Sequence, residues 1–189
     1  MPAILHFNTD FTSIDEVNDD RLAVLQNDYI QHFISIASEK KAIDQYVFYT
    51  GGIHWNDKWE VQYFLKRICS GESHSAQIGS AFIQVFENDP GPVIALLSNT
   101  AEISLEVIRD AFLALEKKDL IFGRDGIGTI QLLGLRSLPT QLEDGNAWIL
   151  LDNKNTIEAL CHELNWNFQA LELNTAARSA SSEEGANSV

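Results

Sequence analysis

The sequence of 189 residues contains few cysteines and few cationic residues. Its two cysteines, Cys69 and Cys161, lie far apart and form no CxxC pair, so we expect two reduced thiols rather than one disulfide. Lysine and arginine number 13 against 27 aspartate and glutamate residues, which gives a formal net charge of −14. Because nucleic-acid binding and docking on anionic membranes both need clustered cations, this balance argues against both kinds of partner.

The chain also lacks a long hydrophobic run. No segment approaches the length that crosses a bilayer, and residues 1–8 have neither the basic region nor the long apolar core of a secretory signal, so we expect a soluble, cytoplasmic protein. The length and the 45% of hydrophobic residues suit one well-buried domain, which we place at residues 1–173. We expect the tail, residues 174–189, to be disordered because it can bury too little apolar surface.

Motifs for several common active sites are missing. Gly123, Gly126 and Gly128 fit neither the phosphate-binding P-loop nor the dinucleotide fingerprint, and a turn between two strands is the favoured interpretation. No serine lies in a GxSxG elbow, so a hydrolase triad has no anchor. The histidines share no metal-ligand spacing, so we expect no zinc site. His54 follows a predicted strand end, but a surface histidine is favoured over a general base.

Hydrophobic periodicity predicts strands that alternate with helices. Trp55 and Trp59 lie four residues apart and could form an aromatic binding face, although core packing is favoured. Ser104 is the expected N-cap of a helix. Alternation of this kind indicates one α/β domain with a mainly parallel sheet. We expect strands at residues 3–7, 46–50, 93–97, 120–122, 130–135 and 168–173, and helices at residues 22–36, 59–68, 77–86, 105–116 and 155–164.

Polar residues follow three of the predicted strands, at 8–10, 50–55 and 98–102. In an open α/β sheet, ligands bind beyond the carboxyl ends of the strands, so we expect any shallow ligand pocket to lie there. Polar loops also follow strands in proteins that bind nothing at that edge. The rule alone therefore leaves both interpretations open.

The segment from residue 98 to residue 135 resembles a known family. It contains SNTAEIS at 98–104, AFLAL at 111–115, DLIFG at 119–123 and a strand at 128–135, where the family has GSDCPDLT, AFxAL, DVVLGP and DGGYYLIGL. These motifs are similar to those of the radical-SAM/selenodomain-associated, glycosyltransferase-like bacterial proteins. They have the GT-A fold, which also houses molybdopterin-guanine nucleotidyltransferases. The resemblance covers about residues 75–165 and implies a GT-A-like (Rossmann-like) three-layer sandwich with a mainly parallel central sheet.

The chemistry of the segment departs from the family's pattern more than its frame does. Asn99 stands where the family has a metal-holding carboxylate, and Ile127 stands where it has the aspartate of DGG, whereas Glu102 keeps its charge at the second acidic position. Residues 8–15 contain no glycine and no lysine where the family has KAPxPGxVKTRL, and they add aspartates. Because a diphosphate needs cations or aligned N–H donors, we expect weaker nucleotide and metal binding.

The resemblance therefore implies a protein like the glycosyltransferases and nucleotide-diphospho-sugar transferases. We expect it to be catalytically degenerate, with the fold retained for binding or for assembly with a protein partner. The alternative is an active transferase that uses a nucleoside diphosphate sugar or a nucleotide with altered metal dependence, and Mg²⁺ or Mn²⁺ is expected only in that case. No catalytic residue is assigned. The expected substrate-binding residues are Asn8, Ser98, Asn99, Glu102 and Asp125.

Overall fold

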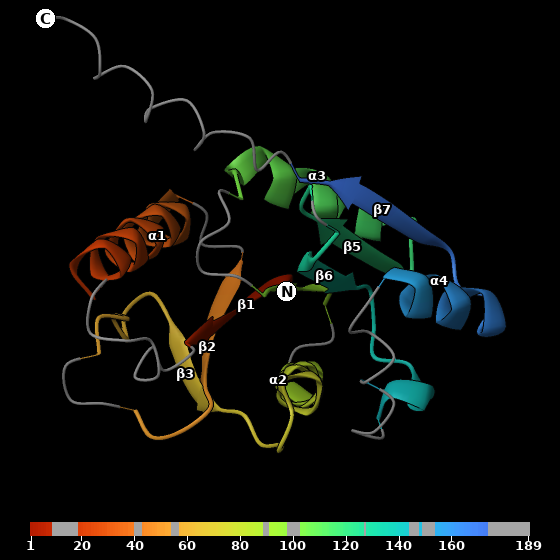
Figure 1. Ribbon diagram of the computed structural model, residues 1–189, viewed down its shortest axis with the longest axis horizontal. Coiled ribbons are helices and arrows are strands. Elements are labelled where there is room, and N and C mark those ends of the chain that lie inside the picture. The colour runs from red at the N-terminus through yellow and green to blue at the C-terminus, as the bar shows by residue number, and fades with distance from the viewer. Residues whose placement is uncertain are drawn as a thin grey trace, which may run out of the picture.

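The computed structural model describes residues 1–8, 19–39, 43–53, 57–88, 91–97, 103–126, 128–143, 148 and 154–173. These residues form three layers, with a sheet between two layers of helices (Figure 1). The predicted tail at 174–189 lies outside them. The strands are β1 (Ala3–Asn8), β2 (Asp44–Tyr49), β3 (Leu65–Ile68), β4 (Val93–Leu96), β5 (Leu120–Arg124), β6 (Ile130–Leu135) and β7 (Phe168–Glu172). The helices are α1 (Asp19–Glu39), α2 (His74–Asn88), α3 (Leu105–Leu115), α4 (Lys154–Glu163) and the short 3-10 helix η3 (Thr140–Leu142).

The sheet has the strand order β3-β2-β1-β4-β6-β5-β7. Only β6 among the described strands runs antiparallel, to both β4 and β5, and every other pairing is parallel. The predicted α/β architecture with a mainly parallel sheet is therefore confirmed. Among the described strands, β7 pairs with β5 alone and lies at the edge of the sheet, as the sequence predicts.

Each face of the sheet is covered by two amphipathic helices. α1 and α3 bury their apolar sides against one face, and α2 and α4 bury theirs against the other (Figure 1). The residues of α1 that recur every three or four positions, Tyr29, Phe33 and Ile36, are buried as their spacing predicts. Ser104 caps α3, where its side chain accepts a hydrogen bond from the backbone N–H of Val107.

The predicted helix at residues 59–68 is wrong. One turn forms, in which the backbone N–H of Phe64 donates to the carbonyl of Glu60, and the chain then enters the edge strand β3. Trp59 and Phe64 are buried under α1, while most of β3 is exposed. Four residues of an exposed edge strand show neither the burial nor the alternation by which strands are recognised in a sequence.

In the described part of the chain, no helix is both long enough and apolar enough to cross a bilayer.

Gly79 allows α2 to lie directly against the indole of Trp148. A Cβ atom on Gly79 would come within 2.5 Å of the Cδ1 and Cγ atoms of Trp148. The indole also stacks on Phe82, with ring centroids 5.0 Å apart, and its Nε1–H donates a hydrogen bond to the carbonyl of Leu142 at 2.7 Å. The indole is therefore held by other contacts and has little freedom to move away from an added methyl group.

Replacing Gly79 with alanine is expected to lower the free energy of unfolding by about 2 kcal/mol, because overpacking a filled core outweighs the better helix propensity of alanine. Urea denaturation measures this change. Gly52→Ala is the matched control, since a Cβ atom at the exposed Gly52 meets nothing within 4 Å. A Gly79→Ala protein as stable as the wild type would show that Trp148 gives way.

Candidate functional site

The order of the strands creates a switch point between β1 and β4. The chain leaves β1 through α1 to β2, on one side of this pair of strands in the sheet, whereas it leaves β4 through α3 to β5, on the other side. The connections therefore diverge beyond the carboxyl ends of β1 and β4, which pair in parallel. Open α/β sheets bind ligands in the crevice at this point, because the loops on its two sides separate there.

Four of the predicted binding residues stand, in the sequence, at or just after the ends of the two strands that meet at the switch point. Asn8 is the last residue of β1, is partly buried and pairs in register with Tyr49. Ser98, Asn99 and Glu102 lie outside the described residues, between Leu97 and the start of the described segment at 103. They stay predictions, as do those for residues 9–10 and 54–55.

Asp125 is held by the turn between β5 and β6. Its Oδ1 accepts a hydrogen bond from the backbone N–H of Thr129 at 2.9 Å, and its Oδ2 accepts one from Nε2 of Gln131, also at 2.9 Å. Gly128 has a φ of 90°, a conformation that glycine adopts without strain, and its N–H donates to the carbonyl of Asp125. Gly126 and Gly128 therefore lie between the two strands, as the turn interpretation expects, whereas Gly123 lies within β5.

Gln131 connects this turn with the end of β4. While its side chain contacts Asp125, its carbonyl accepts a hydrogen bond from the N–H of Leu97 at 2.9 Å. β5 runs parallel to β4 across the intervening β6, so Asp125 lies on the same edge of the sheet as the carboxyl end of β4. Sequence reasoning missed Gln131, because its role depends on a pairing between strands that no local pattern encodes.

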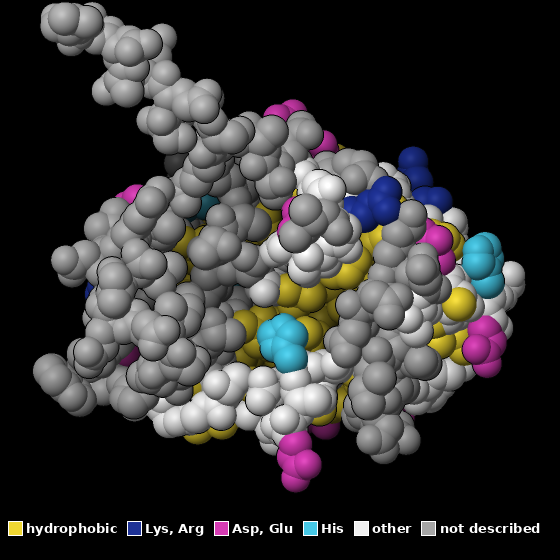
Figure 2. Space-filling model, in the orientation of Figure 1, with side chains coloured by type: hydrophobic (Ala, Val, Ile, Leu, Met, Phe, Trp, Pro, Cys, Tyr) yellow, Lys and Arg dark blue, Asp and Glu magenta, His cyan; other side chains and the backbone are white. Residues whose placement is uncertain are grey.

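Figures 1 and 2 are viewed onto this edge of the sheet, with α2 seen end-on. Hydrophobic side chains are visible in the middle of the face, while most of the Lys and Arg side chains that can be seen from this side lie at the upper right, near β7 (Figure 2). On the β2 side, the ammonium group of Lys66 is paired with Asp57. The described part of the edge therefore shows no cluster of cations in its middle that would neutralise a diphosphate.

A buried polar network lies directly below the switch point, at His6. Nε2 of Gln45 donates to the carbonyl of Phe33 at 3.0 Å, so the Oε1 of Gln45 faces His6 and accepts from its Nε2–H at 3.0 Å. Nδ1 of His6 therefore carries no proton and accepts a hydrogen bond from the hydroxyl of Tyr29 at 3.0 Å. Burial lowers the pKa of His6 to about 3, although the bond to Gln45 opposes the shift. The network joins α1 to the sheet with a neutral imidazole.

A second polar cluster connects β2, the following loop and β3. The carboxylate of Asp57 accepts a hydrogen bond from the hydroxyl of Tyr49 at 2.6 Å and forms an ion pair with Lys66. The side chains of Asp57 and Lys66 are only 6% and 16% exposed. Burial, and then the charge of Asp57, raises the pKa of Tyr49. Tyr49 is therefore a neutral donor at every ordinary pH and is unsuited to act as a base.

Both cysteines are free and buried, as expected of reduced thiols. Burial raises the pKa of Cys161 to about 11, and the nearby charges of Asp119 and Glu158 add to the shift. Burial also raises the pKa of Cys69. Because the thiolate is the nucleophilic form, neither cysteine is suited to covalent catalysis.

A divalent cation at this edge would take oxygen ligands. Among the described residues, no group of three His, Cys, Asp or Glu side chains lies close enough to hold a metal ion. Asp125 lies on this edge, but one of its oxygens accepts a hydrogen bond from Thr129 in the turn and the other from Gln131 in β6. Asn99 and Glu102, the other residues predicted to face a metal ion, lie outside the described residues.

Sequence reasoning missed the two buried polar clusters as well. His6 stands inside the apolar run AILHF, and a polar residue in such a run indicates a hydrogen-bonded core position. Asp57 gave no such signal, because its partners Tyr49 and Lys66 meet it only through the strand pairing. The favoured interpretation of Trp59 as a core residue is confirmed, since it is buried beside His6.

No protein-family model and no curated protein matches this chain. Solved structures, by contrast, do match this chain. A protein of Desulfovibrio desulfuricans G20 described as a nucleotide-diphospho-sugar transferase has a TM-score of 0.71 at 16% identity, over 90% of this chain and 79% of that chain. The 2-C-methyl-D-erythritol 4-phosphate cytidylyltransferase of Francisella tularensis has a TM-score of 0.50 at 10% identity, over 90% of this chain and 89% of that chain. At these identities the likeness shows the fold alone, and it confirms the GT-A-like sandwich. The predicted relationship to radical-SAM-associated proteins stays a prediction.

Proposed function

We propose that this chain is a nucleotide-diphospho-sugar-transferase-like protein that has lost efficient transfer and retains the edge of the sheet at the switch point for binding or assembly. Its ligand there is a nucleotide sugar held weakly, or a protein partner. Asn8, Ser98, Asn99, Glu102 and Asp125 would face that ligand.

The observation that carries the proposal is the identity of the residues that follow β1 and β4. Residues 98–102 come directly after β4 at the switch point, and the resemblance expects a carboxylate where Asn99 stands. An amide contributes no charge to metal capture or to the neutralisation of a diphosphate. The chain after β1 adds Asp10 and Asp15 where the resemblance expects cations. Negative charge next to a diphosphate opposes its binding.

Glu102 supports an alternative, an active transferase with altered metal dependence. It keeps an acidic side chain at the second acidic position of the resemblance, in the segment that follows β4. A bound Mg²⁺ or Mn²⁺ would neutralise phosphate charge there. Glu102, Asn99 and Asp125 are the residues that would hold it.

Calorimetric titration with nucleoside diphosphate sugars, with and without Mg²⁺ or Mn²⁺, distinguishes the two functions. We expect dissociation constants no tighter than about 1 mM, because a site without paired cations retains only uncharged contacts to the ligand. We expect no change on adding metal and no transfer or hydrolysis of the sugar nucleotide.

Glu102→Ala is the test variant. Glu163→Ala is its control, since Glu163 is an exposed carboxylate at the end of α4. Under the proposal, neither variant changes the titration. Metal-dependent binding in the micromolar range that Glu102→Ala weakens and Glu163→Ala leaves intact would establish the active transferase instead.

A further inference from the structure

The helix α3 leaves part of an apolar side uncovered. Leu113, on this side, is 53% exposed, and among the side chains described on helices it is the large hydrophobic one that stays exposed. Next to it lies a cavity of about 270 Å³, between α3 and the residues that enter β1 and β4 at the amino edge of the sheet. The cavity is lined on the α3 side by Arg109, Phe112, Leu113 and Glu116, and on the sheet side by Pro2 and Pro92.

The four α3 residues that line this cavity share one side of the helix. Their spacing of three, one and three residues places them in line along about two turns. The two apolar residues, Phe112 and Leu113, lie in the middle. Arg109 lies about one turn before them, and Glu116 about one turn after them. A cation at one end and an anion at the other make this side complementary to an antiparallel copy of itself.

A twofold axis between Phe112 and Leu113 brings the complementary groups of two copies together. Arg109 of one copy then lies opposite Glu116 of the other, and Phe112 lies opposite Leu113, with each contact made twice. Arg109 is available for such a contact. Its pairs with Glu106, at 3.6 Å, and with Asp110, at 3.2 Å, join side chains that are more than half exposed, and exposed pairs are weak.

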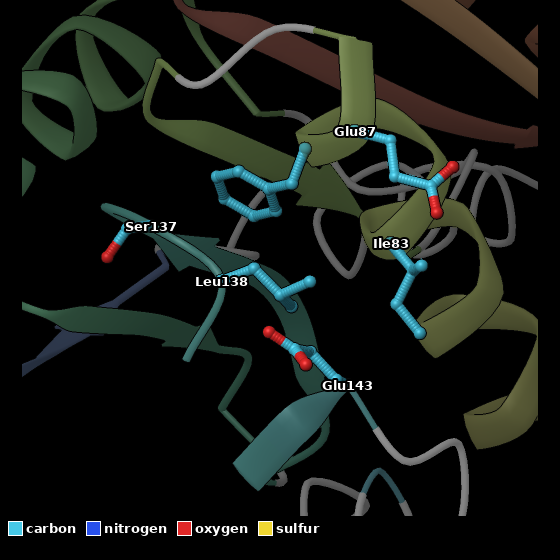
Figure 3. A pocket seen from close by; sticks show the side chains of 6 residues that line it. Ile83, Glu87, Ser137, Leu138 and Glu143 are labelled. Carbon is cyan, nitrogen blue, oxygen red and sulfur yellow. The ribbon is translucent and has the colours of Figure 1, made fainter. Parts of the chain in front are cut away.

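Charge does not oppose a contact between two copies at α3, although the whole chain has a formal net charge of −14. Residues 105–118 contain three acidic and three basic residues, so this segment has no net charge. The larger cavity of about 560 Å³, between α2 and the chain that follows β6, differs in this respect (Figure 3). The charged residues that line its described part, Glu87 and Glu143, are both acidic and exposed, so two copies meeting there would repel each other.

We propose that the side of α3 formed by Arg109, Phe112, Leu113 and Glu116 binds a second copy of this chain, in an antiparallel, twofold-symmetric contact. Leu113 of each copy is buried against Phe112 of the other. The 11 residues of α3 span only about 16 Å, so the interface is small and the dissociation constant is on the order of 100 µM. The contact lies away from the switch point and does not depend on the function proposed there.

Sedimentation equilibrium of the full chain in the presence of a reductant tests the proposal, at concentrations from about 20 to 500 µM that bracket this constant. We expect a reversible monomer–dimer equilibrium without larger species, because a twofold contact is closed. Arg109→Glu and Glu116→Arg each replace two attractive contacts with two repulsive ones, and each should weaken the dimer about tenfold. A chain that stays monomeric throughout this range, or that associates beyond the dimer, would overturn the proposal.

A mixture of the two variants separates this contact from any other mode of association. The Arg109→Glu protein carries an acid at both positions, and the Glu116→Arg protein carries a base at both, so every charge contact in their heterodimer is attractive. With one variant fluorescently labelled, sedimentation should show a heterodimer of wild-type affinity, while each variant alone dimerises weakly. A mixture that associates no better than its components would contradict the twofold contact.

The apolar part of the contact is tested by Leu113→Ser, which should weaken the dimer at least about tenfold because the exposed side chain becomes buried in the complex. Val61→Ser is the matched control, since Val61 is 77% exposed and lies next to β3, at the far edge of the sheet. Equal affinities of the Leu113→Ser and wild-type proteins would show that this side of α3 does not form the interface. Urea denaturation of each variant confirms that the fold is retained.

Discussion

Replacing His6 with leucine is expected to lower the free energy of unfolding by about 4 kcal/mol at pH 7. The substitution removes one side chain and leaves two buried groups without partners, the hydroxyl of Tyr29 and the Oε1 of Gln45. Each buried polar group that loses its hydrogen bond costs about 2 kcal/mol. His6 is fully buried at the centre of the sheet, so water cannot replace either bond. Urea denaturation measures the effect.

A second substitution separates the loss of hydrogen bonds from a change in packing. In the His6→Leu protein, Tyr29→Phe removes the orphaned hydroxyl, so adding it should restore part of the lost stability. In the wild-type protein, Tyr29→Phe should be destabilising, because it leaves Nδ1 of His6 without a donor. Equal costs of Tyr29→Phe in both backgrounds would show that the hydrogen bond contributes nothing.

The His6→Leu variant also tests how the stability of the protein depends on pH. Burial lowers the pKa of His6 to about 3, below the 6.5 of an unfolded chain. Between these values the unfolded state binds a proton that the folded state does not. Stability therefore falls as the pH decreases below 6.5, by at most about 1.4 kcal/mol per pH unit. Between pH 7 and pH 4.5, the His6→Leu protein should lose about 2.5 kcal/mol less than the wild type. Parallel losses would mean that His6 takes up its proton in the folded state.

The sequence predicts well those elements whose buried residues follow a regular pattern, either periodic or continuous. Tyr29, Phe33 and Ile36 recur along α1 because one side of that helix faces the sheet. The strand β4 reads as a continuous apolar run because both of its faces are covered. Such patterns are local, so they survive in a single sequence. The strand β3 shows neither periodic burial nor a continuous apolar run, since it is short, exposed and at an edge of the sheet. The sequence pattern therefore predicts a helix there.

The candidate site is predicted only in outline, for a related reason. The rule for parallel sheets selects one edge from strand ends alone, and Asn8 ends β1 at that edge, where Asp125 also lies. Which side chains meet at that edge depends on strand order and register. The contact between Asp125 and Gln131 needs the antiparallel β6 between β4 and β5. No spacing in the sequence specifies that pairing.

Replacing Asp57 with alanine is expected to lower the free energy of unfolding by about 3 kcal/mol. The carboxylate pairs with Lys66 and accepts the hydroxyl of Tyr49, and both side chains of the ion pair are more than four-fifths buried. Removing one partner of such a pair leaves a charge that is poorly hydrated and unpaired. Because Asp57 also accepts a bond from the backbone N–H of Trp59, the variant should loosen the loop between β2 and β3. Urea denaturation, with hydrogen exchange of residues 57–68, measures both effects.

Further measurements decide whether the unpaired buried charge causes the loss of stability in Asp57→Ala. Asp57→Asn/Lys66→Met removes both charges, and should recover most of the stability that Asp57→Ala loses, because replacing a whole buried pair with neutral groups is often close to neutral. Glu106→Gln breaks a surface pair in which Arg109 and Glu106 are 56% and 77% exposed, and should cost less than about 0.5 kcal/mol. In ~1 M salt the cost of Asp57→Ala should persist, since a buried pair is screened only weakly. If Asp57→Ala costs no more than Glu106→Gln, the ammonium group of Lys66 is hydrated in solution, and the link from β2 to β3 rests on backbone pairing alone.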